Sequence, residues 1–191
     1  MLEGVGTSAY LGAAGLITSK DYLTIAGSIL SVEALHTSLQ RSASKLVAPA
    51  NPFYPPLGPN GVFTLASAFI VSCPESNAAL PFKAFPALTA DTAGPVANGM
   101  PAQFSLAEGD PAGKYVTFVS GITITSVAIE DAIGSGVTVT IPKGVEGQSY
   151  VFITSKDVSG GPGALTDDAI VAGPAIIEAT PDAPTYDPAQ A

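Results

Sequence analysis

Two acidic residues and the only histidine of the chain have the types and the spacing that could bind a metal. Glu3 stands alone, whereas Glu33 and His36 form a Glu-x-x-His motif. If Thr18 and Ser19 form the turn between two antiparallel helices, Glu3 and Glu33 both lie ~22 Å from that turn along their helices. Carboxylates on facing helices, together with Glu-x-x-His motifs, hold pairs of iron or manganese ions in helical bundles. These three residues are therefore predicted metal ligands, and they supply half of such a site.

Two further polar residues extend the candidate site. Tyr10 follows Glu3 on the same helical face, and Gln40 lies about one turn after His36. Each could hydrogen-bond a metal-binding side chain, or could simply be part of a helical core. The acids also have metal-free interpretations: Glu3 suits the first turn of a helix, and Glu33 with His36 could form a buried ion pair.

Two helices have to position these residues. The first is expected at about 2–17, where glycines at 4, 6, 12 and 15 predict close contact between backbones. The second is expected at about 20–43, with Ser19 as its N-cap. Residues 1–46 should therefore form a helical hairpin. One stripe of the second helix is predicted to be buried, and it comprises Tyr22, Ile25, Ala26, Ile29, Glu33, His36 and Gln40.

The two helical segments carry a family resemblance. The sequences LEGVGTSAYLGAA at 2–14 and AGSILSVEALH at 26–36, with SCPESN and FPALT further on, resemble the desiccation- or stress-associated ferritin-like proteins of fungi and bacteria. The resemblance covers roughly residues 1–90. It implies that this chain holds the third and fourth helices of a four-helix bundle, with Glu3, Glu33 and His36 as ligands of iron or manganese. It also implies an exported protein of the cell exterior or cell wall.

The resemblance has a consequence for partners. In such proteins an export signal and two earlier helices, with their own Glu and Glu-x-x-His, come first. This sequence contains neither. We therefore expect the hairpin to be covered by the missing N-terminal helices or by a second copy of the chain.

Beyond the hairpin the pattern changes twice. Residues 47–103 are rich in proline and are expected to wrap around their neighbours, with one short helix between Asn60 and Ile70. Residues 104–180 alternate with period two and predict an antiparallel β-sandwich of immunoglobulin-like topology. Residues 181–191 are expected to be an extended tail. The predicted fold class is α+β.

Composition limits the classes of partner. The chain has 191 residues, a net charge of -9 and only seven Lys plus Arg residues, so we expect no nucleic-acid partner. No stretch approaches the ~20 apolar residues of a membrane span. Cys73 is the only cysteine, which excludes a disulfide within the chain.

The residues and the resemblance together lead to one functional hypothesis and one alternative. The hypothesis is a stress-associated ferritin-like protein whose carboxylate-bridged dimetal centre handles metal or reacts with oxygen or peroxide. The alternative is a metal-free structural protein that makes contacts at the cell surface or in the matrix. The sequence alone leaves open whether the protein is an enzyme.

Overall fold

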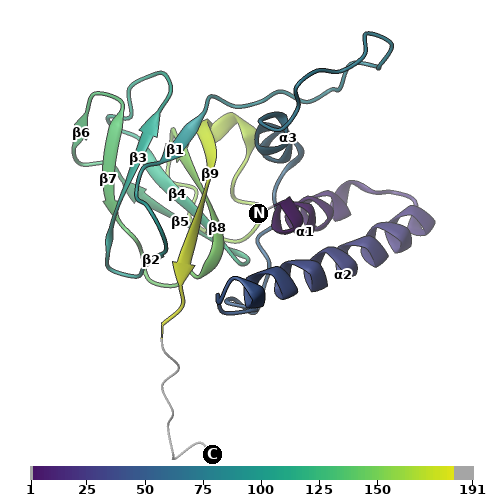
Figure 1. Ribbon diagram of the computed structural model, residues 1–191. Helices are drawn as coiled ribbons and strands as arrows, with labels where there is room; N and C mark the ends of the chain where they lie inside the picture. The colour runs from purple at the N-terminus through teal and green to yellow at the C-terminus, as the bar shows by residue number, and fades with distance from the viewer. Residues whose placement is uncertain (1, 183–191) are drawn as a thin grey trace, which may run out of the picture.

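The computed structural model describes residues 2–182, and it shows a mixed α+β protein in which helices precede a β-rich part (Figure 1). The helical elements are α1 (Leu2–Ala13), a 3-10 turn (Ala14–Leu16), α2 (Lys20–Ala43) and α3 (Pro59–Ser67). The strands are β1 (Leu88–Ala90), β2 (Val96–Ala97), β3 (Pro101–Leu106), β4 (Tyr115–Ser120), β5 (Thr123–Ala128), β6 (Ala132–Ile133), β7 (Gly136–Thr140), β8 (Gly147–Thr154) and β9 (Ile170–Thr180). A second 3-10 turn (Asp167–Ala169) precedes β9. Most of the tail expected at 181–191 lies outside the described residues.

The helices begin where the sequence predicts them to begin. Ser19 has an extended backbone, and its hydroxyl accepts a hydrogen bond from the backbone N–H of Tyr22 at 3.4 Å, which confirms the predicted N-cap of α2. Pro59 occupies the first turn of α3, where its missing N–H has no helical partner to lose. The first residues of α2 and α3 are therefore set by local sequence signals, an N-cap serine and a proline in the first turn.

The strands form two sheets. One has the order β1-β3-β7-β6 with antiparallel neighbours, and the other has the order β2-β9-β8-β4-β5, in which only β2 and β9 are parallel. The immunoglobulin-like topology stays a prediction. The sheets begin at Leu88, earlier than the expected boundary at 104. The short strands β1 to β3 lie among prolines and glycines that weaken the period-two signal, and Pro101 is tolerated as the first residue of β3.

An apolar core lies between the two sheets. Phe118 of β4 is completely buried and meets Phe104 of β3 edge-on, with ring centroids 6.3 Å apart. Seven alternating side chains of the strands are buried: six of them lie in this core, whereas Ile124 lies in a second cluster on the opposite face of its sheet. The seven are Val116, Phe118, Ile124, Val139, Ile141, Val151 and Ile153.

A second apolar cluster joins the helices to the sheet. Val119, Tyr150 and Phe152 lie on the opposite face of β4 and β8, and they pack with Val5 of α1 and Leu57. The two strands are therefore buried on both faces. Alternation along the sequence predicted only one buried face for these two strands. It cannot show that a helical layer covers the other face.

The stripe predicted to be buried on α2 is largely exposed, so that expectation was wrong. Of this stripe only Ala26 is buried, and Tyr22 is 69% exposed. The reason is the arrangement in Figure 1, where the N-terminal half of α2 projects beyond the β-rich part and has only α1 beside it. No helix within residues 2–182 combines the length and the hydropathy that a membrane span requires.

Candidate metal centre

Glu3, Glu33 and His36 meet between the two helices of the hairpin. Nδ1 of His36 lies 3.1 Å from Oε2 of Glu3, at the distance at which a protonated Nδ1 donates a hydrogen bond to a carboxylate. The carboxyl group of Glu33 is hydrogen-bonded to that of Glu3 as well. Glu3 comes from the first turn of α1, whereas Glu33 and His36 lie one turn apart on α2. The helix-and-turn geometry expected from the sequence therefore brings the three side chains together.

The neighbouring carboxyl group of Glu3 changes the protonation of Glu33. Burial raises the pKa of Glu33 above its ordinary value, and the hydrogen bond to Glu3 and the negative charge of Glu3 raise this pKa further. The charge of His36 acts in the opposite direction. The contact with Glu3 therefore favours the protonated form of Glu33. This cluster has the electrostatic character of a site that accepts a cation.

Gly6 leaves space for the carboxylate of Glu33. A Cβ atom added to Gly6 would lie 2.5 Å from Oε2 of Glu33, which is too close for any real contact. The predicted close backbone contact is confirmed at Gly12, which faces the backbone carbonyl of Leu57, whereas Gly4, like Gly6, faces a side chain, that of Gln148. The fourth position differs, because Gly15 has open space around it.

Tyr10 and Gln40 are the two residues that were expected to support the acids and the imidazole. Tyr10 is half-buried and Gln40 is exposed. Among the hydrogen bonds between residues 2–182, none joins either side chain to Glu3, Glu33 or His36. Their supporting role at a metal site stays a prediction.

A polar contact fixes α1 on the sheet. The Tyr150 hydroxyl of β8 donates to Oγ of Ser8 at 2.9 Å and also lies 3.4 Å from the carbonyl oxygen of Gly4. The Gln148 side-chain amide donates in turn to the Tyr150 oxygen at 3.1 Å. Burial raises the pKa of Tyr150, so its hydroxyl stays protonated and remains a donor. One turn of α1, the turn that carries Glu3, is thereby held on β8.

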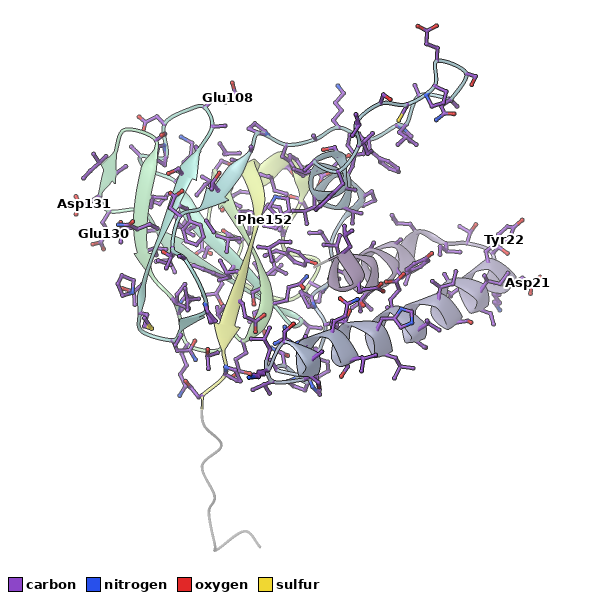
Figure 2. The ribbon with its side chains drawn as sticks, viewed as in Figure 1. Asp21, Tyr22, Glu108, Glu130, Asp131 and Phe152 are labelled. Atoms are coloured by element: carbon purple, nitrogen blue, oxygen red, sulfur yellow. The ribbon has the colours of Figure 1, made fainter. Side chains whose placement is uncertain are left out.

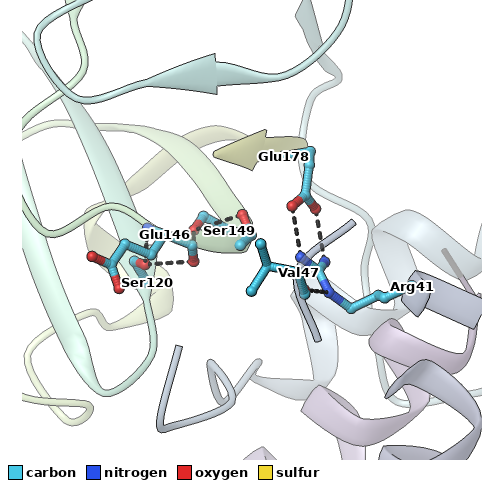
Figure 3. A network of polar contacts seen from close by, with 7 residues as sticks. Arg41, Val47, Ser120, Glu146, Ser149 and Glu178 are labelled. Carbon is cyan, nitrogen blue, oxygen red and sulfur yellow. Dashed lines mark hydrogen bonds and ion pairs between the residues drawn. The ribbon is translucent and has the colours of Figure 1, made fainter. Parts of the chain in front are cut away.

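Arg41 fixes the same end of the hairpin from α2, and sequence reasoning missed it. Its guanidinium donates to both carboxylate oxygens of Glu178 in β9, at 2.8 and 2.7 Å, and its Nε donates to the carbonyl oxygen of Val47 at 2.9 Å (Figure 3). Such a two-pronged pair is strong and directional. The sequence contained a signal for this role. Arg41 is the only arginine of the chain, and it lies on the same face of α2 as the buried Ala26 and Thr37.

The donor types of the cluster fit iron or manganese, which bind carboxylate and imidazole groups in helical bundles. The side chains of His36 and Glu3 are 54% and 31% exposed, so the cluster is open to solvent. Within residues 2–182, no group of three or more His, Cys, Asp and Glu side chains is arranged to hold a metal ion by itself. The described part of the chain therefore presents ligand types without a complete coordination group.

Comparison with known proteins adds one finding at the hairpin. Residues 1–46 match a family model described as a ferritin-like domain. No curated protein matches the chain. The matched residues contain both α1 and α2, and thus all of Glu3, Glu33 and His36.

Proposed function

We propose that Glu3, Glu33 and His36 are half of the ligand set of a carboxylate-bridged centre that holds two iron or manganese ions. The observation that carries this proposal is the contact of two carboxyl groups and one imidazole inside the segment that matches a ferritin-like domain. The ligand types, the two facing helices and the Glu-x-x-His spacing all agree with such a centre.

Each residue has a stated part in the proposal. Glu3 and Glu33 supply carboxylate oxygens, and a bound cation takes the place of the proton that Glu33 tends to hold. His36 supplies an imidazole nitrogen, and its present contact with Glu3 holds the ring beside the acids. When bound, iron or manganese supplies the redox chemistry that metal handling or reaction with oxygen or peroxide requires.

The remaining ligands come from outside the hairpin in this proposal. They belong to the missing N-terminal helices or to a second copy of the chain. Two observations support an external contribution: the match covers residues 1–46, and the α2 stripe around His36 is exposed. A stress-associated role and an extracellular or cell-wall location belong to the same proposal, and the sequence resemblance is what supports them.

Calorimetric titration of the metal-free protein with Mn²⁺, and with Fe²⁺ under anaerobic conditions, tests the proposal. Wild-type protein should bind the metal, and Glu33→Gln and His36→Ala should each weaken binding by about tenfold or more, because each variant removes a ligand. Asp131→Asn is the matched control, since Asp131 is an exposed acid at the far edge of the β-rich part (Figure 2). Equal binding by wild type and both site variants would contradict the proposal.

The alternative function predicts that the protein binds neither metal. A metal-free structural or cell-surface and matrix interaction protein needs the helices and sheets but no cation. Folded wild-type protein that takes up neither metal, and that contains none when prepared from its natural source without chelators, would favour this alternative.

A further inference from the structure

The open face of the hairpin carries two rows of side chains at coiled-coil spacing. On α2 the positions recur after three and four residues in alternation, which is the pattern of a helix that packs along another helix. The row on α2 is Tyr22, Ile25, Ile29, Val32, His36 and Leu39. The row on α1 and the following turn has the same spacing and mostly small side chains in its middle: Leu2, Gly6, Ala9, Ala13 and Leu16.

Apart from the contact of His36 with Glu3, the side chains of the α2 row have no hydrogen-bond or ion-pair partner among residues 2–182. Every side chain in it is exposed, from Tyr22 at the free end of the helix to Leu39, which is 70% exposed. A different row of α2 faces α1, and there Ala26, Thr37 and Arg41 are buried. α2 thus has two packing faces of which one is used.

The face of α1 that touches the β-rich part is also a different one. Gly4, Val5 and Ser8 are buried there against β8 and its neighbours. Gly6 lies on the open side, under the Glu33 carboxylate. The two free rows therefore border the acid cluster, and the sheet does not cover them.

We propose that this face binds a second copy of the same hairpin, with the α2 rows of the two copies antiparallel. An apolar face of this extent drives association in water. The α2 row contains no Asp, Glu, Lys or Arg, so two identical rows meet without repulsion between fixed charges.

The register follows from the row itself. Full antiparallel overlap puts Tyr22 of one copy opposite Leu39 of the other, and Ile25 opposite His36. At the centre Ile29 then faces Val32 across a twofold axis, and each contact occurs twice. Five of the six side chains in each row are apolar, and every position of one row faces a position of the other, so neither copy has to leave part of its row uncovered.

The position of the β-rich part selects the antiparallel arrangement. The C-terminal end of α2 is fixed to β9 through Arg41, whereas the N-terminal end with Asp21 and Tyr22 projects freely into solvent (Figure 2). An antiparallel pair places the two β-rich parts at opposite ends of the joined helices. A parallel pair would place both at one end, where they would compete for the same space.

The dimer also completes the ligand count, and this part of the inference rests on the proposed function. One hairpin supplies Glu3, Glu33 and His36, and two copies supply four carboxylates and two imidazoles. That is the number of side-chain ligands in a carboxylate-bridged site for two metal ions.

Sedimentation equilibrium of the full chain at about 1 to 100 μM, with a chelator present, tests the dimer. Wild type should be dimeric at the upper concentrations, and Val32→Glu should be monomeric because it places two charges at the twofold axis. Ile133→Glu is the matched control: this isoleucine is 91% exposed on the β-rich part, so its replacement should leave the dimer intact. A monomeric wild type, or a Val32→Glu protein that still dimerises, would overturn the proposal.

A disulfide test checks the register. In a Cys73→Ser background, Tyr22→Cys protein mixed with Leu39→Cys protein should form a mixed disulfide under mild oxidation. Ser31→Cys in place of Leu39→Cys should not, because Ser31 lies on the opposite side of α2. Equal yields from the two mixtures would overturn the antiparallel register.

The dimer and the metal centre can fail separately. With chelator present, Glu33→Gln should remain dimeric, since Glu33 lies outside the α2 row. A wild-type monomer that binds metal would refute the dimer and leave the proposed function standing. A dimer that binds no metal would leave the interface standing and refute the proposed function.

Discussion

Glu33 is the residue whose ionisation is most closely tied to the hairpin. It reaches back across α1 to Glu3, and the glycine at position 6 is what lets its carboxylate lie against the helix backbone. Burial and the neighbouring acid both favour its protonated form. The same features that make Glu33 a candidate ligand therefore cost stability whenever no cation or proton is present.

This cost should appear as a pH dependence in the metal-free protein. Because the folded pKa of Glu33 is raised above its ordinary value of 4.5, folding favours the protonated carboxyl group. Its contribution is therefore fully present below about 4.5 and is lost as the pH rises through the raised value. Glu33→Gln imitates the protonated acid and should become more stable relative to wild type as the pH rises from 4 to 8.

Urea denaturation at several pH values, with a chelator present, measures this difference. Glu108→Gln serves as the control, because Glu108 is exposed on a turn of the β-rich part (Figure 2) and should show no such relative gain. A constant stability difference between wild type and Glu33→Gln over this range would contradict the coupling of the two acids.

At the scale of the element, the glycines of α1 are explained by the groups that lie against this helix. Its three glycines lower helix propensity, yet each of them lies against another group of the protein. Gly27 of α2 offers the contrast, since an added Cβ there would meet nothing within 4 Å.

Two glycine-to-alanine substitutions should therefore differ. Gly27→Ala should raise the free energy of unfolding by about 0.5 to 1 kcal/mol, through helix propensity alone. Gly6→Ala should leave the protein folded, because the obstructing atoms are the movable end of Glu33, but it should push that carboxylate away from Glu3. Carbon-13 NMR titration of the glutamates should then show the raised pKa of Glu33 returning towards its ordinary value. An unchanged titration would mean that Gly6 does not position Glu33.

The elements also show which features the sequence could predict. Capping by Ser19, the close backbone contact at Gly12 and the strand pattern after residue 104 depend on local chemistry, and these were predicted. Periodicity identified the stripe of α2 that contains Glu33 and His36, but it could not show whether another part of the protein covers that stripe. The pairing of Arg41 with Glu178 joins residues 137 positions apart, and such a pairing leaves no local signal.

At the scale of the whole molecule, a helical layer is held against one sheet while the other sheet closes the opposite side of the core. The apolar cluster around Tyr150 packs α1 against the sheet, and the Arg41 pair with Glu178 joins the C-terminal end of α2, at the same end of the hairpin, to β9. Together they fix which face of the hairpin meets the sheet and which face stays open.

Removing one partner of the Arg41 pair should destabilise this arrangement. Glu178→Gln should lower the free energy of unfolding by about 3 kcal/mol, because it leaves a largely buried guanidinium without its countercharge. Lys156→Ala is the control: it breaks the solvent-exposed pair with Asp168 and should stay within the error of a urea titration. A loss no larger than that of the control would show that Arg41 does not hold the hairpin.

The distance in sequence between the hairpin and its anchor has a consequence for synthesis on the ribosome. Arg41 is made 137 residues before Glu178, and Ser8 is made 142 residues before Tyr150. At ~5 to 20 residues per second, the hairpin waits roughly 7 to 27 s before the strands that anchor it exist. During this interval both its sheet-facing side and its open rows are bare. A nascent chain of this protein should therefore engage a chaperone or a neighbouring nascent hairpin early, well before β8 and β9 have been translated.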